Sequence, residues 1–243
     1  MPPPSFQTRL VSSTLIAPAV RELVFEKLDG PLKFAPGQWL NMHLPGPKEG
    51  TEITRAYSIA SCPDGTPRFA LAVTKVENGP GSTALHALQP GVEVRATGPQ
   101  GFFTRDADVG HPSLFVATGT GLTPLRSMIH AALREGATEP LVLLLGVRHG
   151  EDRLYADELA ELEAKHPGFK AHFTLSRPSP EWKGRTGYVQ THVDELWKGL
   201  VDAGRGAPHV YICGLERMVK AVRDKLRKEH TVPRDRVHSE RYD

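Results

Sequence analysis

The sequence predicts two domains: an N-terminal antiparallel β-barrel and a C-terminal α/β domain built on a doubly wound parallel sheet. Three observations predict this fold class. The chain has 243 residues, and domains usually have about 100 to 200, so two modest domains can each bury a core. Up to about residue 106, short β-type segments alternate with turns rich in Pro and Gly. Beyond Gly110, apolar strands alternate with amphipathic helices.

Six strands are expected in the N-terminal half. Their ranges are 8–16, 20–28, 38–44, 53–60, 68–76 and 92–98. Turns such as Pro36-Gly37 separate them, and this turn chemistry suits hairpins better than helix boundaries. One short helix is expected over 84–88, where Ser82 or Thr83 can serve as the N-cap.

The C-terminal half is expected to alternate strands with helices. The strands are 113–117, 140–147, 170–176 and 209–213, and the helices are 124–134, 154–166, 189–200 and 216–230. Two of these strands are almost wholly apolar, which favours a parallel sheet covered by helices on both faces. The domain boundary is therefore expected near 106–112, with domains over 1–108 and 109–243.

Composition excludes several classes of function. The hydrophobic fraction of 39% is ordinary, and no apolar run approaches the roughly 18 residues of a membrane span. The N-terminus lacks a signal-peptide pattern, so a cytoplasmic location is expected. A net charge of +2 without runs of like charge does not indicate nucleic acid as a partner. With Cys62 and Cys213 as its two cysteines, the chain has no four-cysteine metal set, so redox chemistry would use an organic cofactor.

The run Arg55-Ala-Tyr-Ser58 combines a cation, an aromatic ring and a hydroxyl along an expected strand. These three groups suit a bound flavin, because Arg pairs with phosphate, an aromatic face covers a flat ring and a hydroxyl reaches a ring nitrogen. The alternative is an ordinary strand in which Arg55 makes a surface ion pair, for example with Glu52.

The second candidate site is the turn between the first strand and the first helix of the C-terminal half. It comprises Thr118, Gly119, Thr120, Gly121 and, after two further residues, Pro124. Glycines let the backbone approach an anion, and the N–H groups of a first helical turn bind phosphate. The alternative is a Gly-rich turn without a ligand.

A weaker anion site is expected at Gly79-Pro-Gly81-Ser82-Thr83, before the short helix. Exposed donors at the start of that helix can bind a phosphate. Read alone, the segment fits a plain N-cap at least as well.

Seven short motifs follow one another along the chain. They are Phe34-Ala-Pro-Gly-Gln38, Arg55-Ala-Tyr-Ser58, Gly79–Ser82, Gly98-Pro-Gln-Gly101, Gly119-Thr-Gly121, Leu145-Gly-Val-Arg148 with Leu154-Tyr155, and Tyr211-Ile-Cys-Gly214. Their order and spacing resemble those of the ferredoxin–NADP reductase superfamily. The resemblance covers nearly the whole chain. It implies an N-terminal FAD-binding barrel, a C-terminal NAD(P)-binding domain and hydride exchange between the two cofactors.

The resemblance also implies roles for single residues. Arg55 would bind the FAD pyrophosphate, Tyr57 would stack on the isoalloxazine, and Ser58 would lie near flavin N5. Cys213, followed by Gly214 at a strand end, would lie beside the nicotinamide, where a small side chain allows the two rings to approach. Taken alone, Cys213 is more typical of a small core residue.

For coenzyme choice the resemblance points to Ser176, Arg177, Arg185 and Tyr188. NAD-preferring relatives often carry an acidic residue near the first pair, whereas here Ser and Arg stand there. The two arginines can bind a 2′-phosphate and Tyr188 can stack on adenine, so NADP is favoured and NAD stays possible. The alternative is that both arginines are solvated loop residues.

The end of the chain carries Glu240 and Tyr242, which resemble a family acidic residue and an aromatic that covers the second face of the flavin. The residue that follows Tyr242 departs from a strictly terminal aromatic. A frayed tail without a function is the alternative.

The expected function is that of an FAD-dependent NAD(P)H oxidoreductase of ferredoxin reductase type. Its catalytic residues would be Ser58, Cys213 and Glu240, and its electrons would pass to a separate acceptor such as a ferredoxin, a flavodoxin or a haem protein. One alternative is a reductase of free flavin or small oxidants. The other is a non-catalytic electron-transfer or binding subunit.

Overall fold

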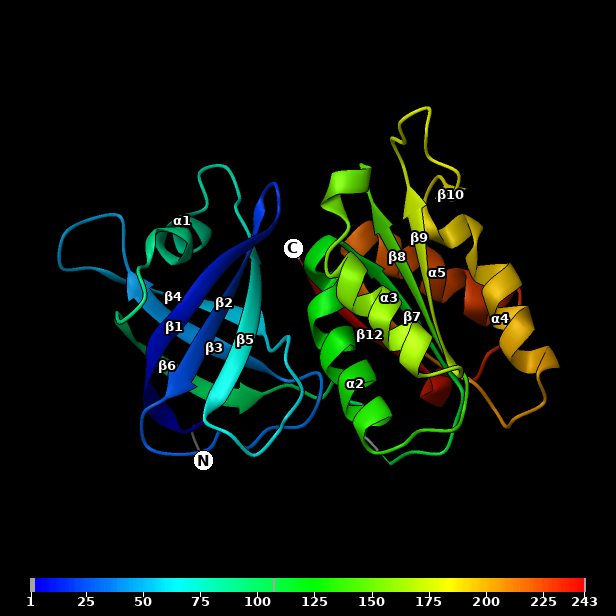
Figure 1. Cartoon of the computed structure of the whole chain (residues 1–243), viewed down its shortest axis with the longest axis horizontal. Helices are drawn as coiled ribbons and strands as arrows, with labels where there is room; N and C mark the ends of the chain where they lie inside the picture. The colour runs from blue at the N-terminus through cyan, green and yellow to red at the C-terminus, as the bar shows by residue number, and fades with distance from the viewer. Residues whose placement is uncertain (1–2, 107, 243) are drawn as a thin grey trace. The chain divides into compact units, whose positions relative to one another are not determined.

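A computed structural model describes residues 3–106 and 108–242 of the chain. The described chain forms two compact units (Figure 1). The first unit runs to Asp106 and also includes Arg126–Ala131, and the remainder belongs to the second unit.

The first unit is the predicted antiparallel barrel. Its elements are β1 (Ser5–Ala17), β2 (Val20–Lys27), β3 (Trp39–Pro45), β4 (Glu52–Ser58), β5 (Arg68–Thr74), α1 (Pro80–Ala87) and β6 (Glu93–Gln100). The strand order is β4-β3-β6-β1-β2-β5, and all described pairs are antiparallel. Just beyond β4, the Ala60 N–H donates to the Ala70 carbonyl of β5 at 2.8 Å. This bond links the segment after the edge strand β4 to the other edge strand, β5, as barrel closure requires.

Large apolar side chains at every second position explain why β2 and β5 form strands of the barrel. In β2 and β5 the buried residues include Leu23, Phe25, Phe69 and Leu71, all 0–1% exposed. The rings of Phe25 and Phe69 stack with centroids 5.7 Å apart across the pair. The barrel core is therefore formed by the inward positions of each strand.

The short helix differs from the prediction. It begins at Pro80, with Gly79 as its N-cap, rather than at residue 84. Proline suits the first helical turn because its φ is preset and it lacks an N–H that would need a partner there. Ser82 and Thr83 therefore lie inside the helix, and the prediction that either one caps it is wrong.

The second unit is the predicted doubly wound α/β domain. Its elements are β7 (Ser113–Thr118), η1 (Gly119–Gly121), α2 (Leu122–Arg134), β8 (Leu141–Val147), η2 (Gly150–Asp152), α3 (Ala156–Lys165), β9 (Phe169–Leu175), β10 (Arg185–Thr186), η3 (Val189–Thr191), α4 (Val193–Asp202), β11 (His209–Leu215), α5 (Glu216–Lys228), η4 (Arg234–Arg236) and β12 (Val237–Tyr242). All described strand pairs are parallel, in the order β10-β9-β8-β7-β11-β12.

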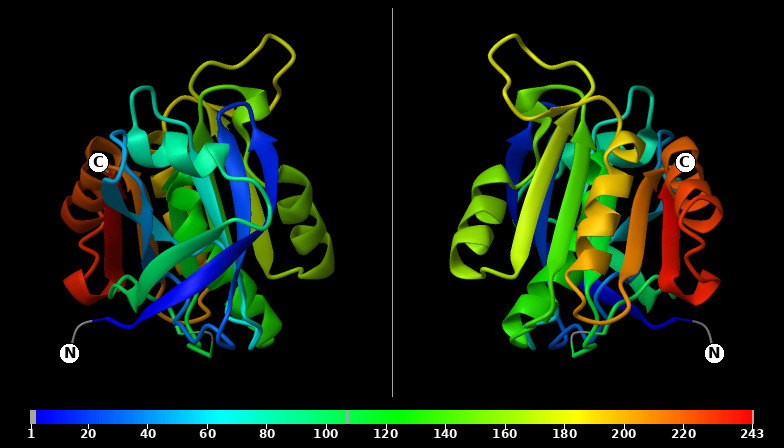
Figure 2. Two further views of the ribbon diagram at one scale, coloured as in Figure 1. Left: turned by 90° about the vertical axis from the view of Figure 1, so that its left-hand side faces the viewer. Right: turned by 90° about the vertical axis from the view of Figure 1, so that its right-hand side faces the viewer.

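This strand order sets the place where a ligand can bind. From β7 the chain builds outward through β8, β9 and β10 on one side, and then crosses to β11 and β12 on the other. The carboxyl ends of β7 and β11 therefore flank the switch point, where open α/β sheets bind ligands. Apolar residues of α4 and α5 cover one face of this sheet, and Figure 2 shows both helices lying along the strands.

Two strands escaped the sequence prediction, β10 and β12. β10 has only two residues, and β12 lies in the tail, where fraying was the alternative. β12 pairs with β11 over six residue pairs, including Cys213 with Glu240. The frayed-tail alternative is therefore wrong for the described part of the tail. No helix in the described ranges is long and apolar enough to cross a membrane.

Candidate cofactor sites in the two units

In the barrel unit, Arg55 and Tyr57 of β4 meet Gly81 of α1. A Cβ at Gly81 would lie 2.6 Å from Arg55 Cγ and 3.1 Å from the Tyr57 hydroxyl oxygen. Both distances are shorter than an ordinary van der Waals contact, so only glycine lets the helix approach β4 this closely. The structure thus brings together three residues that the sequence placed in two separate motifs.

The environment of Tyr57 suits a ring that stacks on a ligand. Burial raises the pKa of Tyr57 to about 12, and the positive charge of Arg55 opposes this rise only in part. The phenol therefore stays neutral at physiological pH. Among the described residues, Glu52 pairs with Arg95 (Nη2 to Oε1, 2.6 Å) and not with the neighbouring Arg55. Arg55 Nη1 instead donates to the Thr54 carbonyl at 2.9 Å.

Ser82 holds the turn before α1 through its hydroxyl. The Ser82 Oγ accepts from the Val76 N–H and donates to the Gly79 carbonyl, both at 3.1 Å. Thr83 is exposed, and its N–H donates to the Gly79 carbonyl at 3.0 Å. The first-turn N–H groups of α1 thus lie next to Arg55, an arrangement that can bind a phosphate.

Ser58 ends β4 and is buried, with 7% of its surface exposed. In the strand register it lies opposite Trp39 of β3. As the last residue of β4, it follows Tyr57 directly and completes the expected group of cation, ring and hydroxyl.

In the α/β unit, the turn after β7 packs directly on the end of β11. A Cβ at Gly121 would lie 2.3 Å from the Cys213 carbonyl oxygen. One at Gly214, whose φ is +147°, would lie 2.2 Å from Thr118 Oγ1. Glycine is needed at both positions, because a larger residue would separate the two strand ends at the switch point.

Thr118 provides evidence for a polar ligand at this point. Its Oγ1 is buried and has no hydrogen-bond partner among the described residues. Buried hydroxyls are normally paired, so an unpaired one beside Gly119–Gly121 fits a site that a polar group of a nucleotide completes.

The Cys213 thiol is buried and stays protonated. Burial raises its pKa, the carboxylate of Glu240 raises it further, and a hydrogen bond from Tyr242 lowers it only in part. A neutral thiol is a small, polarizable surface rather than a nucleophile. This property suits close packing against a planar ring.

The last strand, β12, contacts the start of α2 through Tyr242. Its hydroxyl lies 3.1 Å from the Thr123 Oγ1 at the start of α2, and Thr123 in turn donates to the Thr120 carbonyl at 2.9 Å. Thr123 is a residue that the sequence reasoning did not select, and the pairing spans 119 positions. Pro124 follows it as the third residue of α2.

The predicted coenzyme-tail residues lie around the carboxyl end of β9. Arg177 is exposed, and its backbone is held by Arg148 and by a His149 Nδ1 contact of 3.0 Å to its carbonyl. Ser176 donates its N–H to the Val147 carbonyl at 3.0 Å. Tyr188 is 58% exposed, as a side chain that stacks on a ligand can be.

Arg185 is engaged by a residue that the sequence reasoning missed. Its Nη1 and Nη2 donate to the two carboxylate oxygens of Glu195 at 2.6 and 2.8 Å. No local motif marks Glu195, although its position in the first turn of α4 is typical of acidic residues.

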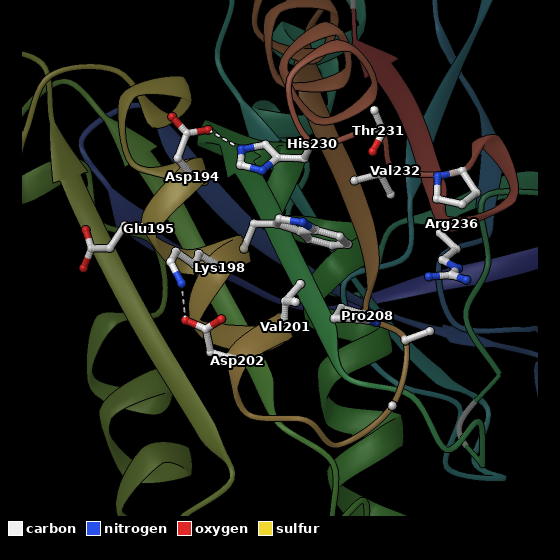
Figure 3. Close-up of a pocket in the computed structure, with 14 residues that line it drawn as sticks. Asp194, Glu195, Lys198, Val201, Asp202, Pro208, His230, Thr231, Val232 and Arg236 are labelled. Atoms are coloured by element: carbon white, nitrogen blue, oxygen red, sulfur yellow. Dashed lines mark hydrogen bonds and ion pairs between the residues drawn. The ribbon is translucent and has the colours of Figure 1, made fainter.

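A separate cavity of about 870 Å³ lies between α4 and residues 230–236 (Figure 3). Its lining includes Pro208, which precedes β11, and Arg236, which precedes β12. It therefore lies at the amino end of these strands, opposite the carboxyl end that carries Cys213. This cavity is not part of the predicted nucleotide site.

Family models match both units. The oxidoreductase FAD-binding domain matches residues 7–104, and the oxidoreductase NAD-binding domain matches residues 115–224. The two matched segments coincide with the barrel and the α/β sheet described above.

Whole-chain comparisons give the same result. The chain is 56% identical over 240 residues to ferredoxin–NADP reductase B of Sorangium cellulosum, covering 98% of both chains. It is 33% identical to the reductase component DmpP of a Pseudomonas phenol 2-monooxygenase, covering 93% of this chain and 62% of that protein. The crystal structure of the Amycolatopsis cytochrome P450 reductase GcoB superposes with a TM-score of 0.81 at 27% identity, covering 98% of this chain and 69% of that one.

Proposed function

Because the chain belongs to the ferredoxin–NADP reductase family, we propose that it oxidises NADPH through bound FAD and delivers the electrons to a ferredoxin. Membership makes the chain an FAD-dependent NAD(P)H oxidoreductase. The choice of coenzyme, the acceptor and the role of each residue are the proposed parts.

The observation that carries the proposal is the close packing of the turn at Gly121 on the Cys213 backbone, which leaves no room for a Cβ, next to the unpaired hydroxyl of Thr118. This packing supports the proposal because the turn that we propose to bind phosphate, a small neutral side chain and a buried polar group meet at one switch point. When bound, FAD accepts a hydride from the nicotinamide coenzyme and releases the electrons singly.

The residues of the barrel unit hold the flavin in this proposal. Arg55 and the first turn of α1, with Gly81, Ser82 and Thr83, bind its pyrophosphate. Tyr57 covers its ring system, where a buried neutral phenol packs at low cost. The Ser58 hydroxyl exchanges a proton at flavin N5.

The residues of the α/β unit orient the coenzyme. Gly119, Thr120 and Gly121, followed by Pro124, bind its pyrophosphate, and Thr118 bonds the nicotinamide end. Cys213 and Gly214 leave room for the nicotinamide ring, because both are small and the thiol carries no charge.

Glu240 and Tyr242 complete the group on the last strand. Glu240 lies opposite Cys213 in the register of β11 and β12. We assign to Glu240 the holding of a proton near the reacting atoms, and to Tyr242 the protection of the flavin from water until the coenzyme displaces it.

NADPH is the proposed coenzyme because Ser176 and Arg177 follow β9, with no acidic residue at either position, and Arg185 lies on the neighbouring β10. Arg177 and Arg185 are the proposed ligands of the 2′-phosphate, and Ser176 is a further donor. Tyr188 is the proposed stacking surface for adenine.

Ferredoxin is the proposed acceptor because the relative that matches this chain over 98% of both lengths is a ferredoxin–NADP reductase. The longer reductases of oxygenase systems, of which this chain spans about 62% in the DmpP case, make an oxygenase component a second candidate acceptor. A flavodoxin or a haem protein would serve the same chemistry.

The domain boundary and the location in the cell are further parts of the proposal. We place the boundary between an FAD-binding domain and an NADP-binding domain at 108/109, supported by family matches that end at 104 and begin at 115. We also propose a cytoplasmic location, where both cysteines would stay reduced and NADPH is supplied. Cell fractionation with an antibody against the chain tests it.

The test is rapid mixing of the purified, FAD-loaded protein with NADPH and with NADH. Bleaching of the flavin absorbance that is faster with NADPH, followed by reoxidation with added ferredoxin, is the expected result. A colourless protein that turns over added flavin would favour the flavin-reductase alternative. A flavin that neither coenzyme bleaches would leave the non-catalytic alternative.

A further inference from the structure

We propose that Glu195 is a positioning residue that weakens the hold of this site on the 2′-phosphate of NADPH by engaging Arg185 in an ion pair. The inference rests on the proposed function, because it concerns the same coenzyme site. It assigns to Glu195 the part of a competitor for one of the two phosphate-binding arginines.

The geometry of the pair supports competition. Both terminal nitrogens of Arg185 donate to both oxygens of Glu195, at 2.6 and 2.8 Å. This is the fork-to-fork arrangement that a phosphate would also adopt with an arginine. The same two donors therefore serve either the carboxylate or the phosphate.

The backbone of Arg185 cannot move away from this position easily. Arg185 lies opposite Thr174 in the register of β10 and β9. Its carbonyl accepts from the Trp182 Nε1–H at 2.8 Å, and the Arg153 guanidinium lies 5.3 Å from the Trp182 ring centroid. Release from Glu195 therefore needs only side-chain rotation and leaves the β10 backbone in place.

The exposure of the Glu195 side chain favours its displacement from Arg185 by the 2′-phosphate when the coenzyme binds. The Glu195 side chain is 66% exposed and that of Arg185 is 24% exposed. In Figure 3 the Glu195 carboxylate points away from the residues across the cavity, such as Val232 and Arg236. Water can solvate the exposed carboxylate of Glu195 once it is released, so a phosphate of nearly two negative charges displaces it from Arg185, at a cost in affinity.

Arg177 makes the competition selective. It is exposed and forms no ion pair with any residue in the described ranges. The positive charge of Arg177 is thus available to a phosphate at all times, while Glu195 neutralises that of Arg185 until the phosphate binds. NADH lacks the phosphate and should not respond to Glu195.

The test compares Glu195→Gln with Asp202→Asn. Asp202 is a second carboxylate on α4 and pairs with Lys198 of the same helix, so its variant changes the net charge equally (Figure 3). The probes are adenosine 2′,5′-bisphosphate and AMP, titrated by calorimetry, together with KM values for NADPH and NADH.

We expect Glu195→Gln to bind the bisphosphate about two- to fivefold more tightly and to lower the NADPH KM by a similar factor, the range that exposed pairs contribute. AMP binding, the NADH KM and kcat should not change, and Asp202→Asn should match the wild type. In an Arg185→Gln background the gain should disappear, since Glu195 acts through Arg185.

Unchanged or weaker bisphosphate binding by Glu195→Gln would overturn the inference, as would an equal gain in Asp202→Asn. A structural role for Glu195 predicts a loss and cannot produce a gain. Failure of the proposed coenzyme choice is a separate result, because it would appear as a wild-type preference for NADH.

Discussion

Gly121 should be the least replaceable residue of the nucleotide turn, and Gly121→Ala tests this. The added Cβ would lie 2.3 Å from the Cys213 carbonyl oxygen, 2.6 Å from its carbon and 2.9 Å from Gly214 Cα. All three are backbone atoms, so no side-chain rotation relieves the overlap. The φ angle of Gly121 is not in the left-handed region, so the effect is steric alone.

The size of the effect follows from these contacts. Ordinary contacts of a Cβ are 3.4–4 Å, so the turn and the end of β11 must separate by about 1 Å, an overpacking that costs about 1–3 kcal/mol. For a chain of this size the apparent Tm should fall by about 2–12 °C. Because Cys213 moves with its carbonyl, hydride transfer should slow on the order of 10²-fold, the known cost of a 1 Å misplacement.

The assay measures thermal unfolding and the rate of flavin bleaching by NADPH in the FAD-loaded protein. Gly150→Ala is the matched control, since Gly150 also lacks a left-handed φ and a Cβ added to it would meet nothing within 4 Å. A Gly121→Ala protein with the Tm and bleaching rate of the control would refute the steric reasoning.

Three further predictions concern single side chains. Tyr57→Ala should weaken FAD binding by about tenfold or more, while Tyr57→Phe should retain it. Because burial raises the pKa of Tyr57 to about 12, the FAD affinity, followed by FAD fluorescence, should show no tyrosine titration below about pH 10. A tyrosine titration in that range would contradict the burial. Because burial raises the pKa of the Cys213 thiol, the rate of flavin bleaching should not change with thiol ionisation up to about pH 10. Cys213→Ala should slow bleaching, and an unchanged rate would remove Cys213 from the site. Burial, with the charges of neighbouring His111 and His238, lowers the pKa of His209 to about 4. The unfolded chain therefore takes up the proton at a higher pH than the folded one, and stability is lost as the pH falls from about 6.5 to about 4. The Tm of His209→Gln should fall less than that of the wild type over this range, and equal losses would contradict the pKa shift.

Local patterns predicted most of the secondary structure because each expected strand or helix carries its own periodicity. The apolar segment 140–147 is β8, and the expected strand over 68–76 is β5. The start of α1 was missed because Pro80 resembles a loop residue, although proline favours a first helical turn. Strand β12 was missed because a short polar segment acquires its strand character from pairing with β11.

Some residues of the candidate sites could likewise be predicted from local motifs, and others could not. The motifs around Arg55 and Gly119 were visible because their chemistry is local: residue types at short spacing carry it. Glu195 and Thr123 were not visible, because nothing in their own neighbourhood shows that they meet Arg185 and Tyr242.

The sequence by itself determined the two-domain fold class and, through the order and spacing of seven motifs, the resemblance that implies two cofactor-binding domains, since residue types at short spacing can be read without tertiary context. Tertiary structure decided which groups touch: Gly121 with the Cys213 carbonyl, Thr123 with Tyr242, and Glu195 with Arg185. The physical reason is that strand pairing and close packing bring together residues up to 119 positions apart, and no local pattern in the chain encodes such distances.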